Sequence, residues 1–239
     1  MRCFLIGGGR DPEGVAASHA PFAAAAGGPD ATVVAYLLDE GAETDPDRWR
    51  VALTGAGAGA VRTVVLSPSR PPAAADLDGA SGVFVAGGET PGYQQRFAVA
   101  DGWVAALRER GLPYAGFSAG AAIAATAAIV GGWRDGAVAV CDPDVGEGLE
   151  PLTVRPGLGL LPGAVDVHCA QWGTLPRLLA ALRRRPGTVG WGIDEHTTLE
   201  RDGDRVRVHG LGAVHRATAA ADGRATVAAL TAGDTAALS

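Results

Sequence analysis

The most constraining feature of this sequence is a series of short, largely apolar runs at residues 3–6, 31–38, 61–66 and 81–86, which do not follow a strict apolar–polar alternation. Strands with one solvated face alternate apolar and polar residues, whereas continuous apolar strands are covered on both faces. The segments between the runs have helical character, and helices are expected over 13–26, 45–53, 94–110 and 174–184. We therefore expect an α/β protein, a three-layer α/β/α sandwich around a mostly parallel central sheet.

A further apolar run, at residues 113–117, leads into Ser118 and an alanine-rich helical segment. Gly116 and Gly120 flank the serine in a Gly-x-Ser-x-Gly pattern. Such a turn holds the serine in a strained backbone conformation, in which a β-carbon on either flank would clash. Because a strand precedes the serine and a helix follows it, Ser118 is interpreted as the candidate nucleophile, with the Ala119 amide as one oxyanion donor.

Two glycine-rich turns follow other predicted strands. Gly87 and Gly88 let backbone amides approach a ligand closely, and the Gly88 N–H is the candidate for a second oxyanion donor. The triple glycine at 7–9 lacks the spacing of a dinucleotide fingerprint. No organic cofactor is expected.

A serine hydroxyl needs a base, and the base works best when a carboxylate holds it. Of the five histidines, His168 ends the apolar segment 157–168 and precedes a predicted helix, which is where α/β folds place site residues. Asp194 and Glu195 follow another glycine-rich strand. Either carboxylate is a candidate partner of the histidine.

Composition narrows the function classes. The net charge of -6 argues against nucleic acid as a main partner. All 20 basic residues are arginine, so the chain has no lysine that could act as a nucleophile. Three scattered cysteines form no disulfide framework and fit a reduced cytoplasm. The N-terminal apolar run is far shorter than a signal-peptide core, and no run has membrane-spanning length. The acidic segment 141–150 does not match a calcium loop, so no metal is expected.

Four blocks of the sequence carry a family resemblance. They are Gly87-Gly88-Glu89-Thr90, Gly116-Phe-Ser-Ala-Gly-Ala, Asp166-Val-His with the following Leu175-Pro-Arg-Leu-Leu, and Gly192-Ile-Asp-Glu-His-Thr. Together, over residues of about 80 to 216, they resemble the serine peptidases that include dipeptidase E and cyanophycinase.

The resemblance implies a single domain over residues 1–239 with a fold like the class I glutamine amidotransferases. It implies a triad of Ser118, His168 and Glu195, with Asp135 as a rival acid because in the dipeptidase branch the acid follows the nucleophile closely. It also implies a small peptide substrate and a homodimer formed by elements near the sheet edge. The expected substrate-binding residues are Glu89, Thr90, Asp166, Gln171 and Arg177. The turn Arg201-Asp-Gly-Asp predicts a β-hairpin near the C-terminal end.

The sequence departs from the cyanophycinase pattern around His168. Val167 stands where that branch has a glutamine, Trp172 and Thr174 stand where arginines are expected, and Arg177 remains. This loss of positive charge argues against a polyaspartate substrate, while Arg177 favours a short acidic peptide.

Two other functions fit parts of the sequence. One is an α/β-hydrolase esterase that uses Ser118, Asp194 and a late histidine, His209 or His215. The other is a catalytically idle member of the family that binds a peptide or metabolite.

Overall fold

The computed structural model of the chain describes residues 1–238, which form an α/β protein with mixed sheets. The helices are α1 (Pro12–Ala25), α2 (Pro46–Gly55), α3 (Thr90–Ala98), α4 (Trp103–Glu109), α5 (Ala119–Ala124) and α6 (Leu175–Arg183). Short 3-10 segments are η1 (Gly28–Asp30), η2 (Gly41–Glu43), η3 (Ala74–Leu77) and η4 (Pro143–Val145). The strands are β1 (Cys3–Ile6), β2 (Thr32–Leu38), β3 (Ala60–Leu66), β4 (Gly82–Val85), β5 (Tyr114–Phe117), β6 (Ala125–Gly131), β7 (Arg134–Asp135), β8 (Val138–Ala139), β9 (Thr153–Pro156), β10 (Leu161–Val167), β11 (Val189–Ile193), β12 (Thr197–Asp202), β13 (Arg205–Gly210), β14 (Val214–Ala219), β15 (Ala225–Leu230) and β16 (Thr235–Ala237).

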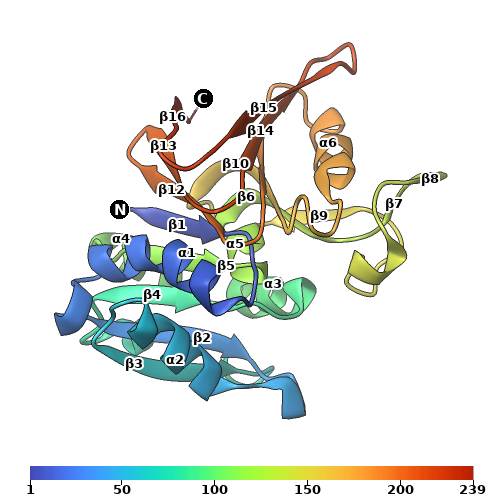
Figure 1. Ribbon diagram of the computed structural model, residues 1–239. Coiled ribbons are helices and arrows are strands. Elements are labelled where there is room, and N and C mark those ends of the chain that lie inside the picture. The colour runs from blue at the N-terminus through green and yellow to red at the C-terminus, as the bar shows by residue number, and fades with distance from the viewer. Residues whose placement is uncertain (239) are drawn as a thin grey trace.

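The first sheet has eight strands in the order β16-β13-β12-β1-β5-β4-β2-β3. Its half from β1 to β3 is parallel, as the continuous apolar runs predict, and the strands from β12 onward are antiparallel. Helices α1 and α2 pack against each other and against strands of this sheet (Figure 1). The predicted hairpin is confirmed, since β12 and β13 pair across the turn between Asp202 and Arg205.

A second sheet of six strands, in the order β15-β14-β11-β10-β6-β9, differs from the expected single central sheet. Strands β6, β10 and β11 are parallel, and the other three are antiparallel additions. The consecutive strands β11 and β12 belong to different sheets, so the chain turns sharply between them at residues 194–196. Helix α6 covers this sheet at β10, β11 and β14 (Figure 1).

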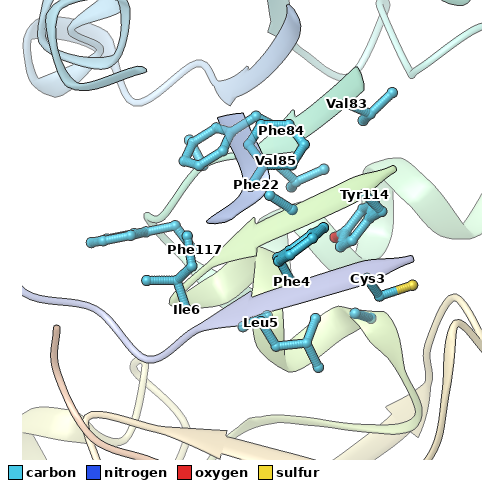
Figure 2. Packing of buried hydrophobic residues seen from close by; sticks show 14 of the residues in the cluster. Cys3, Phe4, Leu5, Ile6, Phe22, Val83, Phe84, Val85, Tyr114 and Phe117 are labelled. Atoms are coloured by element: carbon cyan, nitrogen blue, oxygen red, sulfur yellow. The ribbon is translucent and has the colours of Figure 1, made fainter. Parts of the chain in front are cut away.

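The main core lies around β1 and its neighbours in the first sheet. Figure 2 shows side chains of β1, β4 and β5 in this cluster together with Phe22 of helix α1, whose ring packs on those of Phe4 and Phe84. Phe84 and Phe117 also contact the indole of Trp49, with ring centroids 5.2 and 4.9 Å apart. Each fully buried side chain of this size stabilises the fold by roughly 1.5–3 kcal/mol, so the strand that ends at Ser118 is held firmly.

Two helix predictions need correction. The segment 94–110 is two helices: α3 ends at Ala98, and α4 begins after Gly102, whose φ of 73 is a left-handed conformation that a continuous helix cannot contain. The alanine-rich segment after Ser118 is helical only to Ala124 and then becomes strand β6. Helix α5 contacts strands of both sheets, so the turn at Ser118 lies where the two sheets meet.

Candidate active site

Ser118 occupies a strained turn between β5 and α5. Its backbone has φ 51 and ψ -109, a conformation that L-residues rarely adopt. A β-carbon at Gly116 would collide with the Gly120 carbonyl group, and one at Gly120 would collide with the carbonyl of Val85. Both flanking glycines are therefore required for this turn, which raises the serine hydroxyl above the end of the strand.

A hydrogen-bonded series joins three of the predicted side chains. The Oγ of Ser118 lies 2.8 Å from Nε2 of His168, and Nδ1 of His168 lies 2.7 Å from Oε1 of Glu195. A neutral imidazole that carries its proton on Nδ1 donates to Glu195 and accepts from the serine hydroxyl. This is the geometry required of a base that activates a serine.

Parallel pairing of two strands brings the histidine and the carboxylate together. Val167 of β10 pairs with Ile193 of β11, so the chain leaves both strands at the same edge of the sheet. Gly8 has φ 122 and passes so close to the His168 ring that a β-carbon would collide with it. The ring is therefore confined between the glycine loop and the residues that follow β11.

The protonation of His168 is set by its surroundings. Burial lowers the pKa of the imidazole, and the Glu195 carboxylate opposes this effect only in part. The side chain of His168 is 7% exposed and that of Glu195 is 23% exposed. The neutral, proton-accepting form of the histidine is therefore favoured at physiological pH.

The rival acids lie elsewhere. Asp194 accepts from the amides of Ala170 and Ala213, each at 3.0 Å, and lies 3.2 Å from Nε2 of His215. Asp135 is paired with Arg184. Neither carboxylate is hydrogen-bonded to His168 within residues 1–238.

The histidines of the esterase alternative are also engaged away from the serine. His209 lies 2.6 Å from Glu200, and His215 is paired with Asp194. Within the described chain, the histidine bonded to Ser118 is His168.

The two expected oxyanion donors belong to turns that touch each other. A β-carbon placed on Gly87 would lie 3.2 Å from the Ser118 β-carbon, so the glycine turn after β4 packs directly on the serine turn. Gly88 has φ 151, a conformation that favours glycine. Its N–H donates no hydrogen bond to any group in residues 1–238 and remains available to a ligand.

These groups open into a cavity of about 1140 Å³. It is lined by Ser118, His168 and Glu195, by residues of the segment 37–49, by the turn 87–89 and by the segment 144–147. The indole of Trp172 also lines it and stacks flat on the His168 ring, with centroids 3.6 Å apart and planes 5° apart. Sequence reasoning marked Trp172 only as a departure from the cyanophycinase pattern, although it lies one helical turn after His168.

The predicted substrate-binding residues divide into those at the cavity and those that support it. Glu89 lines the cavity, and Thr90 donates from its N–H and Oγ1 to the Glu147 carboxylate, at 3.3 and 2.9 Å. The Oε1 of Gln171 accepts from the Glu195 N–H at 2.9 Å, so Gln171 orients the acid. Glu147 was missed, because the segment around it was interpreted only as a solvated loop near the site.

Asp166 and Arg177 require a correction. They do not line the cavity; their side chains are 2% and 5% exposed and form a bidentate pair, with N–O distances of 2.8 and 2.7 Å. Burial lowers the pKa of the Arg177 guanidinium, but Asp166 raises it by more, so the arginine stays charged. A guanidinium saturated in this way is not free for a substrate carboxylate.

One group of side chains has ligand types suited to a metal ion. In residues 1–238 the metal-binding atoms of Cys169, Asp194 and His215 lie within 4.8 Å of one another. The Asp194 oxygens are already engaged by two amides and the imidazole, and burial raises the pKa of the Cys169 thiol to about 12. This cluster fits a hydrogen-bonded support behind His168 and Glu195 better than a metal site.

A hydroxyl, an imidazole and a carboxylate in series beside a cavity are the arrangement of a serine hydrolase. The model of Peptidase family S51 matches residues 47–209, and the chain belongs to this family of serine peptidases. No helix within residues 1–238 has both the length and the apolar character needed to cross a membrane.

The similar proteins that carry a name are consistent with membership of this family. The chain is 36% identical over 154 residues to cyanophycinases from Trichormus variabilis and Nostoc sp., a match that covers 59% of this chain and 46% of each relative. The match thus spans about half the length of these curated relatives.

Two solved structures share the fold. A peptidase from an acI-B1 Actinobacterium has a TM-score of 0.65 at 19% identity, over 99% of this chain and 96% of the other. A putative peptidase E protein from Listeria monocytogenes EGD-e has a TM-score of 0.56 at 16% identity, over 88% and 98%.

Proposed function

We propose that this protein hydrolyses a peptide or amide bond in a small peptide, with Ser118 as nucleophile, His168 as general base and acid, and Glu195 as the carboxylate that orients the imidazole. The observation that carries this proposal is the hydrogen-bonded series from Ser118 Oγ through His168 to Glu195. Membership of a serine peptidase family supports it.

The reaction follows from that series. Ser118 Oγ attacks the carbonyl carbon while Nε2 of His168 takes its proton, and the negative charge on the carbonyl oxygen is stabilised by the amides of Gly88 and Ala119. The imidazolium then gives its proton to the leaving amine, which leaves an acyl ester on Ser118. Water, deprotonated by the same imidazole, hydrolyses the ester and restores the serine.

The substrate in this proposal is a small peptide without an assigned acidic character. An acidic substrate was expected because Arg177 was to bind its carboxylate, but that guanidinium is paired with Asp166. Cyanophycin is not proposed as the substrate either, because the arginines expected to bind its acidic backbone are absent around His168.

The proposal extends to the organisation of the chain. We include in it one domain over residues 1–239, the three-layer sandwich of the class I glutamine amidotransferases and a homodimer formed at a sheet edge. Light scattering tests the last point: a mass near 48 kDa, twice the 24.0 kDa of the chain, is expected, and a mass of one chain would refute the dimer.

Labelling with a serine-directed fluorophosphonate tests the nucleophile directly. Mass spectrometry should find the label on Ser118, and the label should be absent from His168→Ala and present in Ser69→Ala, which removes an exposed serine. Ser118→Ala should fold normally and lose peptidase activity by about four orders of magnitude or more. Turnover that survives in Ser118→Ala would refute the proposal.

A further inference from the structure

The cavity beside Ser118 carries an excess of negative charge. Apart from Glu195, its lining includes six carboxylates and the guanidinium groups of Arg10 and Arg48. The six carboxylates belong to Glu40, Glu43, Asp45, Glu89, Asp144 and Glu147. Within residues 1–238 none of these six forms an ion pair with a nitrogen closer than 4 Å. Arg177 acts on Glu147 and Arg48 interacts with Asp45 over longer distances, but the carboxylates of the lining outnumber its guanidinium groups, so a bound cation would meet a net negative charge.

Glu147 is built into this wall by its own hydrogen bonds. Its carboxylate accepts from Thr90 N at 3.3 Å and from Thr90 Oγ1 at 2.9 Å, and its backbone has φ 56. Burial raises the pKa of this carboxyl group, while the bonds from Thr90 act in the opposite direction. The charge is thus partly desolvated, and in such surroundings its attraction for a cation is stronger than at an open surface.

The buried pair described above holds the segment that carries Glu147. Arg177 uses Nε and Nη2 for Asp166 and donates from Nη1 to the carbonyl oxygen of Val145 at 2.7 Å. At the next residue of the same loop, the carbonyl oxygen of Gly146 accepts from the Gly132 N–H at 2.8 Å. The loop is therefore held at Val145 and at Gly146, immediately before Glu147, and the position of the Glu147 carboxylate depends on these bonds.

Thr90 links Glu147 to the turn that touches the nucleophile. Gly87 packs on Ser118, and Thr90 follows it by three residues. Glu40 reaches the same turn from the first sheet, since its Oε1 accepts from the Glu89 N–H at 2.6 Å. The two carboxylates thus bind the neighbouring residues Glu89 and Thr90, and both line the cavity that Ser118 also lines.

We propose that Glu147 is the specificity-determining residue of this peptidase and that it binds a cationic nitrogen group of the substrate peptide, with Glu40 contributing to the same field. This inference rests on the proposed function and names the substrate class, a peptide with a positive charge next to the scissile bond. A bare metal ion is a poorer occupant, because the oxygens of Glu40, Glu89 and Glu147 do not form a set within 4.8 Å of one another. A guanidinium or ammonium group on a peptide spans a wider site.

Matched peptides test the charge preference. We would measure kcat/KM for short peptides that contain arginine and for the same peptides with citrulline, which has nearly the same shape without the charge. An N-acetylated copy of each peptide separates a side-chain cation from the N-terminal ammonium. The kcat/KM of the arginine peptide should exceed that of the citrulline peptide by about tenfold or more, as expected for one partly buried charge pair. If the N-terminal ammonium is the bound group, acetylation rather than the exchange of arginine for citrulline should lower kcat/KM.

Glu147→Gln is the decisive variant, because the amide oxygen still accepts from Thr90 while the charge is removed. It should lower kcat/KM for the cationic peptides about tenfold more than for the neutral, acetylated citrulline peptide. Glu109→Gln, which removes an exposed carboxylate remote from the cavity lining, is the matched control and should change neither peptide. Equal losses on all peptides, or a parent enzyme indifferent to charge, would overturn the assignment.

Binding separates this inference from the proposed function. In a Ser118→Ala background, calorimetry should show tighter binding of the cationic peptide than of the neutral one, and Glu147→Gln should abolish that difference. If the parent enzyme hydrolyses no peptide but this binding difference is present, the proposed hydrolysis fails and the charge selection stands. If peptides are hydrolysed through Ser118 without any charge preference in turnover or binding, only the charge selection fails.

Discussion

The buried pair of Asp166 and Arg177 should make a large contribution to stability, which Asp166→Asn would reveal. The substitution keeps the volume of the side chain but removes the negative charge that faces the Arg177 guanidinium, which is 5% exposed. Removing one partner of a buried ion pair leaves the other charge uncompensated and typically costs about 3–5 kcal/mol of unfolding free energy. Since a folded domain has only about 5–15 kcal/mol of stability, this is a substantial fraction.

Urea unfolding followed by tryptophan fluorescence measures this loss. With a urea slope of about 2.5 kcal/mol per M, the unfolding midpoint of Asp166→Asn should fall by about 1–2 M. Asp47→Asn is the matched control, because it breaks a solvent-exposed pair with Arg50 and should cost less than about 1 kcal/mol. A loss below about 1 kcal/mol in Asp166→Asn would refute the assignment of an uncompensated buried charge.

A double variant separates stability from positioning. Asp166→Leu with Arg177→Met replaces the pair by apolar side chains, an exchange that often restores most of the stability. It also removes the donor to the Val145 carbonyl group, so the loop that carries Glu147 loses one of its two fastenings. The double variant should therefore unfold near the parent midpoint and still lose its preference for cationic peptides.

Further predictions concern the histidines and the indole. Because burial lowers the pKa of His168, the midpoint of the acid limb in the pH profile of kcat/KM should lie below the ordinary histidine pKa of about 6.5. Glu195→Gln should move this midpoint lower still, because the Glu195 carboxylate raises the pKa of the imidazole. The bond to Asp194 raises the pKa of His215, so its contribution to stability is complete below about pH 6.5 and is lost as the pH rises through the folded-state pKa. In urea unfolding, His215→Gln should thus cost more at pH 5.5 than at pH 9, by less than about 1 kcal/mol since the pair is partly exposed; an equal cost at both pH values would contradict this. Trp172→Ala should reduce kcat about tenfold by freeing the His168 ring, whereas Trp172→Phe should retain most activity.

Most of the parallel half of the first sheet could be predicted because four of its strands, β1, β2, β4 and β5, are buried on both faces. Burial on both faces requires continuous apolar residues, and such runs are legible in a sequence. The encounter of His168 and Glu195 follows from the same logic, because the parallel strands β10 and β11 end at a common edge and the residues beyond them meet there. Ser118 follows β5 of the other sheet, so its contact with His168 depends on how the two sheets meet. What could be predicted is the neighbourhood of these residues; their roles are for the labelling and substitution experiments to decide.

The division into two sheets could not be predicted, because it depends on pairing between distant segments. Residues 119–130 consist mostly of alanine, which has high helix propensity and carries little periodic signal. Pairing of β6 with β10 and β9 overrides that propensity from Ala125 onward. The small residues near the C-terminal end gave no strand signal either, yet β15 and β16 extend one sheet each.

The substrate charge that is inferred for this cavity depends on the position of one guanidinium, that of Arg177. An arginine at position 177 of an amphipathic helix suggests a binding site for a carboxylate when the helix is considered alone. In the fold, Asp166 of β10, eleven positions earlier in the chain, faces this arginine and accepts hydrogen bonds from two of its nitrogens. The guanidinium then supports the loop that presents Glu147, so an arginine expected to attract anions instead holds a carboxylate in the cavity wall. Positions 166 and 177 must therefore be considered together when the substrate charge of such a chain is inferred, because an arginine that is paired inside the fold does not bind a substrate carboxylate.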